Sequence, residues 1–229
     1  MRIILKSFLY SFYFIKSSWK EYAPLALYLF ISQFLIMLIQ NIFFVLLFFV
    51  GYLVISAPLV INIFRNIILD ESVGNSYLSC ISKSYTKIFI NRTFYLLFSV
   101  IGIYILHVIV LSPFFPENIS SLTIYLYILF IYMIYIYSRI LFILPAAACG
   151  IKKNLKDSYV LTKNRSLKTY FLYISIIIPY LLINMSISYY SEILEIKEFF
   201  LFLAIFLQIF FTIISTSLVG YIYKGFKGK

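Results

Sequence analysis

The chain has 229 residues, of which 63% are hydrophobic and only 12% charged, and its mean hydropathy is +1.01. Soluble domains average about 45–50% apolar and about 25% charged residues, so this composition excludes a soluble globular protein. The net charge of +11 would favour nucleic-acid binding in a soluble chain, but in a membrane protein its meaning depends on where the charges lie. We therefore predict an all-α membrane protein that does not bind nucleic acid.

Apolar runs long enough for a helix to cross the hydrocarbon core occur six times along the chain. The predicted membrane spans are residues 23–39, 43–64, 94–111, 122–144, 167–188 and 199–223. The links between the first and second, third and fourth, and fifth and sixth spans are short, and short links join antiparallel neighbours. The sequence therefore predicts three antiparallel hairpins of transmembrane helices.

The basic residues are segregated to one side of this predicted topology. Every Lys and Arg except Lys197 falls on the side that also holds the two ends of the chain. The opposite side carries Lys197 and four acidic residues: Glu117, Glu192, Glu195 and Glu198. Cytoplasmic loops of membrane proteins are enriched in Lys and Arg, so both termini are predicted to be cytoplasmic.

A basic amphipathic segment precedes each hairpin, at about residues 3–20, 75–92 and 151–163. In the second of them, Tyr77, Ile81, Tyr85 and Ile88 share one helical face, with Ser and Lys on the other. Three such helices are expected to lie on the cytoplasmic surface, where their lysines attract anionic lipids of the inner leaflet. Alternatively, these segments are ordinary loops whose lysines only enforce the topology.

The sequence contains no pattern typical of a catalytic or metal site. No Asp or Glu lies inside a predicted span, and neither His-Glu-x-x-His nor Gly-x-Ser-x-Gly occurs. The only histidine, His107, is expected to be a hydrogen-bonded packing residue, and Cys80 and Cys149 are expected to be small packing residues. We predict a protein that is not an enzyme and that has no cofactor, no metal and no catalytic residues.

Arg139 is the one charged residue inside an apolar run, five residues before the predicted end of the fourth span. Three phenols fall near its helical face: Tyr135, Tyr132 and Tyr125. One interpretation is a contact site for an anion such as a phospholipid head group, because a guanidinium binds phosphate through two donors. The other is an arginine that reaches the interface and pairs with one of three carboxylates: Asp70, Glu71 or Asp157.

Three prolines lie within or at the cytoplasmic end of predicted spans: Pro58, Pro145 and Pro179. Each removes a backbone donor from its helix and favours a kink or a break. Such kinks either open a cavity between the spans or only shape the bundle.

Two stretches carry a resemblance to a known family. Residues 138–148 (SRILFILPAAA) place an arginine before an apolar-Pro-Ala run, and Ser158, Tyr159, Leu161 and Thr162 follow after a short interval. This pattern resembles the YciC-like six-span proteins of bacterial inner membranes and the membrane domain attached to some glycerophosphodiester phosphodiesterases. Asn164 stands where that pattern usually has glycine, while Arg65 and Glu71 match an arginine and an acidic residue after the second span.

The resemblance implies six spans in a bacterial cytoplasmic (inner) membrane and no catalytic residues. We therefore expect a non-enzymatic protein with an envelope-associated or lipid-associated role, or one that binds a membrane-protein partner. The alternative is a transporter or permease subunit that lacks its own energy-coupling domain. A water-accessible central cavity running toward Arg139 would favour a transporter or a lipid-binding protein, whereas a closed bundle with Arg139 in an ion pair would favour a packing or interaction protein.

Overall fold

The computed structural model describes residues 2–39, 41–71, 80–111, 119–193 and 197–227. These residues form helices joined by short turns, and no strand occurs among them. Five helical segments are long and apolar enough to cross a membrane: Ile42–Leu69, Ser84–Val110, Ile128–Ala148, Lys163–Tyr190 and Phe199–Phe226. The predicted all-helical class and the membrane character of the chain are thus confirmed.

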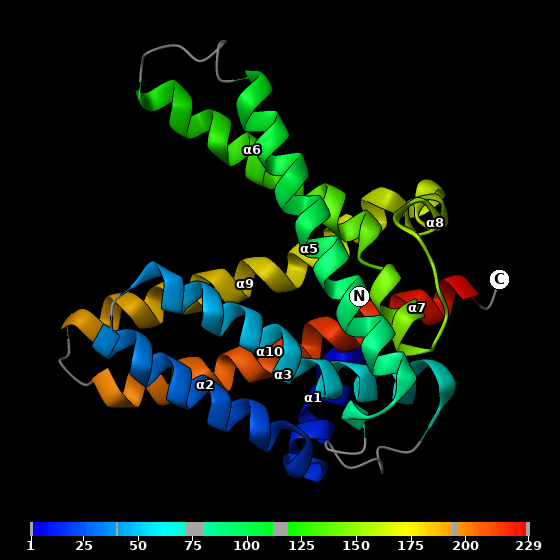
Figure 1. Cartoon of the computed structure of the whole chain (residues 1–229), viewed down its shortest axis with the longest axis horizontal. Helices are drawn as coiled ribbons and strands as arrows, with labels where there is room; N and C mark the ends of the chain where they lie inside the picture. The colour runs from blue at the N-terminus through cyan, green and yellow to red at the C-terminus, as the bar shows by residue number, and fades with distance from the viewer. Residues whose placement is uncertain (1, 40, 72–79, 112–118, 194–196, 228–229) are drawn as a thin grey trace.

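The helices follow one another along the chain with few intervening residues (Figure 1). They are α1 (Arg2–Ser17), α2 (Trp19–Ile39), α3 (Ile42–Leu69), α5 (Ser84–Leu111), α6 (Ile119–Ile140), α7 (Ile143–Ala148), α8 (Leu155–Leu161), the 3-10 turn η2 (Lys163–Arg165), α9 (Ser166–Ile193) and α10 (Lys197–Lys227).

The boundaries differ from the predicted ones in two places at the N-terminal half. Helix α5 runs unbroken from Ser84 to Leu111, so the end of the expected amphipathic helix at 75–92 and the expected span at 94–111 form one helix. No proline interrupts this stretch, and the first glycine in it is Gly102, so the backbone has no reason to break near Arg92. Residues 75–79 lie outside the described part. The first predicted span lies in α2, which is not among the five segments.

The fourth predicted span, 122–144, is interrupted by a turn. Helix α6 ends at Ile140, and the separate short helix α7 begins at Ile143. Pro145 explains the break, because it lacks the N–H that would bond to the carbonyl of Leu141 in a continuous helix. That carbonyl instead accepts a shorter-range bond from the N–H of Leu144, at 3.0 Å.

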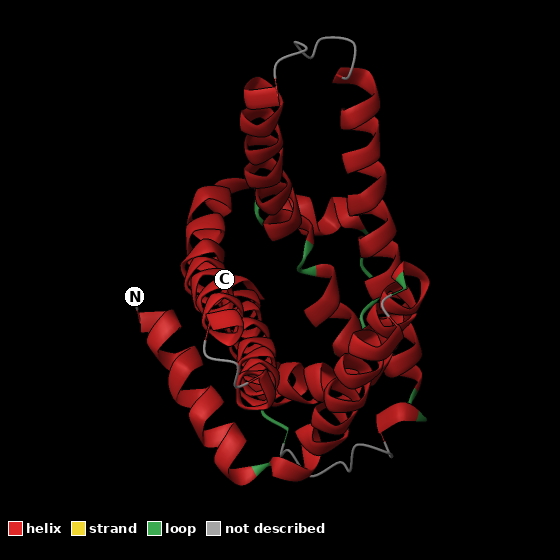
Figure 2. Ribbon diagram, turned by 90° about the vertical axis from the view of Figure 1, so that its left-hand side faces the viewer, coloured by secondary structure: helices red, strands yellow, loops and turns green. Residues whose placement is uncertain are grey.

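Helix α10 is the centre of the packing and contacts α1, α2, α3 and α9. Helices α2 and α3 lie side by side, as do α9 and α10, so these four form a bundle (Figure 1). Helix α5 and most of α6 diverge from this bundle in both views (Figures 1 and 2). Their outer halves expose large apolar side chains, including Leu106, Ile109 and Ile128.

Helix α7 is enclosed by neighbouring helices, and all six of its residues are buried. It packs against α3, α5 and α10, and its sequence ILPAAA explains how. Three consecutive alanines allow neighbouring backbones to approach closely, as small residues do at helix contacts in membranes. The helix ends at Ala148, and Gly150, two residues later, continues the chain through a left-handed turn with a φ of 77°.

Helix α1 lies against α10 through a face of small residues. Ser7 and Ser11 are fully buried there, and the Ser217 hydroxyl on α10 donates to the Ser7 carbonyl at 3.4 Å. Several large apolar side chains of α1, such as Leu9 and Phe12, remain exposed.

Candidate functional site

The Arg139 guanidinium, the predicted candidate, lies buried between α6 and α8 with 5% of the residue exposed. Its Nε donates to the hydroxyl of Thr162 at 3.3 Å, and one terminal nitrogen donates to the carbonyl of Tyr159 at 3.0 Å. The guanidinium carbon also lies 3.4 Å from the centroid of the Tyr159 ring and 5.9 Å from that of Tyr135. Arg139 therefore holds α8 against the end of α6.

Helix α8 contributes a second bond to the same contact. Its fully buried Ser158 donates its hydroxyl to the backbone carbonyl of Arg139 at 2.9 Å. Carbonyls in the last turn of a helix lack intrahelical partners, so a side-chain donor is needed where they are buried. Asp157 caps the other end of α8, where its carboxylate accepts the Asn154 N–H at 2.9 Å.

The predicted phenol stripe does not gather around the guanidinium as a unit. Tyr135 lies near Arg139, as expected, and its ring also makes an edge contact with Tyr170 on α9. Tyr132 instead packs against the ring of His107 on α5. Tyr125 lies closer to the N-terminal end of α6, further from Arg139. His107 itself bonds to the Ile103 carbonyl one turn earlier, at 2.8 Å.

None of the three carboxylates considered as partners for Arg139 forms an ion pair with it. Glu71 pairs with Arg65, Asp70 pairs with Lys224, and Asp157 serves the helix cap. Each of these carboxylates contacts a group that lies nearer to it. Arg139 instead donates to Thr162 and to the Tyr159 carbonyl, and it packs against aromatic rings. Within the described residues the buried guanidinium has no acidic partner.

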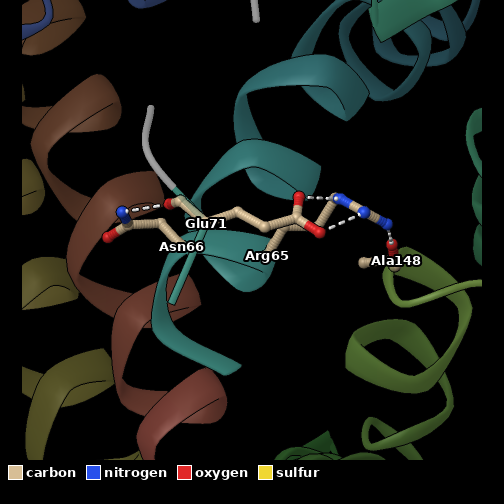
Figure 3. Close-up of polar contacts among 4 residues, drawn as sticks. All are labelled: Arg65, Asn66, Glu71 and Ala148. Atoms are coloured by element: carbon tan, nitrogen blue, oxygen red, sulfur yellow. Dashed lines mark hydrogen bonds and ion pairs between the residues drawn. The ribbon is translucent and has the colours of Figure 1, made fainter. Parts of the chain in front are cut away.

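Arg65 forms a second arginine site, which joins three segments (Figure 3). Its Nε and one terminal nitrogen contact the two carboxylate oxygens of Glu71 at 2.7 and 2.5 Å. The other terminal nitrogen donates to the carbonyl of Ala148 at 3.2 Å, at the C-terminal end of α7. Asn66 donates to the Glu71 carbonyl at 2.7 Å and fixes the backbone that carries this carboxylate.

The position of Arg65 suits a cation. The C-terminal end of a helix carries partial negative charge on its unpaired carbonyls, so a guanidinium there stabilises α7. The Tyr85 ring on α5 adds a cation–π contact, with the guanidinium carbon 4.3 Å from the ring centroid. One side chain thus links α3, α5 and α7.

The fold brings several motif residues of the sequence resemblance into contact at two sites. Arg139 meets Ser158, Tyr159 and Thr162 across the α6–α8 contact, and Arg65 joins Glu71 to the alanine run of α7. Reasoning from the sequence singled out both arginines but missed these partners, since serine and threonine in a polar segment give no signal of burial. The spacing within the motif was the only available clue.

A buried acid that the sequence analysis did not single out lies at the start of α2. Glu21 is 7% exposed, and its carboxylate accepts a bond from the Asn62 side chain of α3 at 2.7 Å. Burial raises the pKa of Glu21 above its ordinary value, and the Asn62 bond opposes part of that change. No spacing rule linked these residues, which are 41 positions apart.

Two of the three prolines border cavities. Pro58 lines a space of about 240 Å³ between α2, α3 and α5, together with apolar residues such as Ile55 and Ile90. Pro179 lines a space of about 120 Å³ formed mainly by α9 and α10. A third cavity of about 100 Å³ is lined partly by hydroxyl side chains: Tyr137, Tyr173, Ser215 and Thr216.

The described residues contain no group of three or more His, Cys, Asp or Glu side chains placed to hold a metal ion. Cys80 is fully buried and Cys149 half-buried. No family model matches the chain, and no curated protein or solved structure matches it either. The resemblance to the YciC-like group therefore stays a prediction from the sequence motif.

Proposed function

We propose that this chain is a six-span protein of a bacterial cytoplasmic membrane, with both termini in the cytoplasm and a non-enzymatic, lipid-associated role. The observation that carries the proposal is that basic side chains lie near the ends of α3, α6 and α10 and at or beside the start of α9. We call this the basic end and define it by Arg65, Arg139, Arg165, Lys168 and Lys224.

Contacts between helix ends support this grouping. Lys224 near the end of α10 pairs with Asp70 at the end of α3, with its nitrogen 2.7 Å from the nearer oxygen. Arg165, the last residue of η2 directly before α9, lies over the Phe226 ring of α10, with its guanidinium carbon 5.4 Å from the ring centroid. From these ends the helices continue without charge, for example over residues 22–64, 169–191 and 199–223. An anionic membrane surface matches such an arrangement.

Helix α2 completes the proposed six spans. It has 21 residues, and its charged residues, Lys20 and Glu21, lie in the first turn. It lies beside α3 and α10, two of the segments able to cross a membrane. The exposed apolar side chains of α1, including Leu9 and Phe12, are suited to the lipid interface beside this bundle.

Cysteine labelling in intact cells tests the orientation. In a chain with Cys80→Ala and Cys149→Ala, a membrane-impermeant thiol reagent should label Glu117→Cys from outside. The matched control, Lys152→Cys, should react only after the membrane is permeabilised. Equal labelling of both positions, or the reverse order, would refute the proposed topology.

Native mass spectrometry tests the lipid role. The purified protein in gentle detergent should retain phosphatidylglycerol in preference to phosphatidylcholine, because the basic end attracts anionic head groups. Equal retention of the two lipids would contradict the proposal. Arg139→Ala is tested separately. If this variant selectively loses phosphatidylglycerol, Arg139 contacts lipid in addition to joining α6 and α8.

The hydroxyl-lined cavity between α3, α6, α9 and α10 favours a second candidate, a transporter or permease subunit that draws energy from a partner. Ser215 and Thr216 are the positions to test, because they lie on α10 within this cavity. Reaction of Ser215→Cys with a small, impermeant thiol reagent in membranes would indicate a water-accessible path. Protection of Ser215→Cys would favour the lipid-associated role.

A further inference from the structure

Two cavities lie one after the other along the same face of α9. The first, about 70 Å³, is at the basic end and is lined by Arg165 of η2 and by Lys168 and Thr169 of α9, with Ile222 and Phe226 of α10 opposite. The second, about 120 Å³, begins at Ser175 and continues past Pro179 to Ile183.

The lining residues of α9, together with Arg165, which directly precedes it, recur every three or four positions, so they form one continuous strip along the helix. They are Arg165, Lys168, Thr169, Leu172, Ser175, Ile176, Pro179, Tyr180 and Ile183. Between Leu172 and Ser175 the helix rises only about 4.5 Å, so the two cavities lie close together along this one strip. We refer to it as the α9 groove.

The character of the α9 groove changes along its length. Its mouth carries two exposed cations, Arg165 and Lys168, and neither forms an ion pair with an acidic residue in the described part of the chain. Beyond Leu172 the lining is almost entirely apolar. From Arg165 to Ile176 the helix rises about 16 Å, close to half of the roughly 30 Å hydrocarbon core.

Aromatic rings form the walls of the apolar part. Tyr180 stacks on Phe211 with ring centroids 4.0 Å apart, and Phe8 of α1 lies beside Phe210 at 6.1 Å. The groove between them is open toward the side of the bundle, because Phe8 and Ile183 remain partly exposed. An occupant can therefore enter from the surrounding lipid.

We propose that the α9 groove binds one anionic phospholipid of the inner leaflet, with its phosphate at Arg165 and Lys168 and an acyl chain along Leu172, Ile176 and Pro179. Charge complementarity selects the head group, and the apolar strip one leaflet deep selects a lipid over a soluble anion. This proposal rests on the proposed function, since it assigns a specific site for the lipid association.

The test compares variants of the full chain by native mass spectrometry after incubation with phosphatidylglycerol or phosphatidylcholine. The double variant Arg165→Gln with Lys168→Gln should weaken phosphatidylglycerol binding about 30-fold, because it removes the attraction of two basic residues for an anionic head group. The binding of phosphatidylcholine should change little. The matched control, Lys152→Gln with Lys156→Gln, removes two exposed lysines elsewhere and should have less than a twofold effect.

A second variant tests the apolar part. Ser175→Trp fills the α9 groove and should reduce the binding of both lipids, while Arg165→Lys keeps the charge and should retain phosphatidylglycerol. Thermal unfolding in detergent shows that each variant is folded before the comparison.

The outcomes separate this proposal from the broader one. If both double variants lose phosphatidylglycerol equally, the attraction is diffuse and the α9 groove is not the site, although the lipid role stands. If the wild-type chain shows no preference for phosphatidylglycerol, the proposed function itself fails. Displacement of the bound lipid by inorganic phosphate would assign the mouth to a free anion and overturn the assignment of the groove.

Discussion

Arg139 and Tyr159 lie face to face, with the guanidinium carbon 3.4 Å from the ring centroid, although they belong to different helices. This contact and the bond from Arg139 to the Tyr159 carbonyl hold α8 on the end of α6. Helix α8 has only seven residues, and isolated helices of that length are not stable in water. Its order therefore depends on this attachment.

Replacing Arg139 with methionine should release α8. The variant loses the charged hydrogen bonds and the cation–π contact, together about 2–4 kcal/mol of local stability. Hydrogen exchange of the backbone amides in Leu155–Leu161 should accelerate by at least tenfold. The control is Arg92→Met, which removes another arginine near a tyrosine, with the guanidinium carbon 5.8 Å from the ring of Tyr95. Unchanged exchange in α8 of Arg139→Met would contradict the assignment.

Two substitutions of Tyr159 distinguish the contribution of its ring from that of its hydroxyl. Tyr159→Phe keeps the aromatic face and should leave the exchange of α8 amides almost unchanged. Tyr159→Leu removes the ring and should cost about 1–2 kcal/mol, the value of a cation–π contact that is partly shielded from water. Equal exchange rates in these two variants would indicate that the Tyr159 ring is not what holds Arg139.

The Arg65–Glu71 pair should contribute more to stability than its neighbour, Asp70–Lys224. Its side chains are 18% and 39% exposed, against 43% for Lys224 and 79% for Asp70. Glu71→Gln should lower the unfolding free energy by about 1–2 kcal/mol, between the values for exposed and buried pairs. Asp70→Asn, the control, should cost less than about 1 kcal/mol, because exposed pairs contribute little.

Thermal unfolding in detergent measures both changes. Arg65→Lys is a second check, because lysine keeps the charge but cannot bond Glu71 and the Ala148 carbonyl as a planar fork does. It should be destabilised about as much as Glu71→Gln. A larger loss for Asp70→Asn than for Glu71→Gln would reverse the ranking drawn from the exposure of the side chains.

Gly51 on α3 should tolerate no side chain. A Cβ there would overlap the Tyr28 hydroxyl of α2, which donates to the Phe48 carbonyl at 2.7 Å. Gly51→Ala should therefore destabilise the protein by about 1–3 kcal/mol, as overpacking does. Gly102→Ala is the control, because no atom lies within 4 Å of its added Cβ. That change should be neutral or stabilising, since alanine favours helix.

A relieving second change makes the Gly51 test specific. Tyr28→Leu removes the hydroxyl and ring end, so in that background Gly51→Ala should cost much less than in the wild type. Additive losses for the two substitutions would show that the glycine is not required by Tyr28. The measurement is again the midpoint of thermal unfolding.

Glu21 should make stability depend on pH. Burial raises the pKa of Glu21 in the folded protein, so the folded state holds the proton more tightly than the unfolded state. The stabilising contribution is complete below the ordinary glutamate pKa and is lost as the pH rises through the raised value. At neutral pH, Glu21→Gln should therefore be more stable than the wild type, because glutamine keeps an acceptor for Asn62 without a buried charge.

The difference between Glu21→Gln and the wild type should shrink as the pH falls below the raised pKa of Glu21. Asn62→Ala should have the opposite effect at neutral pH, since the buried carboxylate then loses its donor. Thermal unfolding measured across a pH series follows both. A difference that stays constant at all pH values would exclude Glu21 as the titrating group.

The apolar runs and Pro145 illustrate how far one sequence determines local structure. A run of about 20 uncharged apolar residues can satisfy its backbone in lipid only as a helix, so helices were predictable wherever such runs occur. The effect of Pro145 was also predictable as a kink or break, because the missing donor is a local property. The continuity of α5 through Arg92 was not, since an amphipathic pattern and a following apolar run do not show whether the backbone breaks between them.

The partners of the candidate residues could not be obtained in the same way. Arg139 was identifiable as a charge in an apolar run, yet its carboxylate partners were inferred from proximity in topology alone. In the structure Glu71 pairs with Arg65, which is only six residues away in the chain. The contacts of Arg139 come from Ser158 and Thr162, which are 19 and 23 positions away. Glu21 and Asn62 meet only because α2 packs along α3.

The sequence by itself determined that this is an all-helical protein of membrane character. Hydropathy is a local property, so each apolar run of sufficient length favours lipid, where its backbone must be helical. Tertiary structure alone decided which side chains share a site, because hydrogen bonds and ring contacts require distances that only packing sets. It placed Arg139, for which the sequence left open an anion contact or an ion pair, in the contact that attaches α8 to α6. It also placed Arg165 and Lys168 at the mouth of an apolar groove, which no periodicity in the chain had indicated.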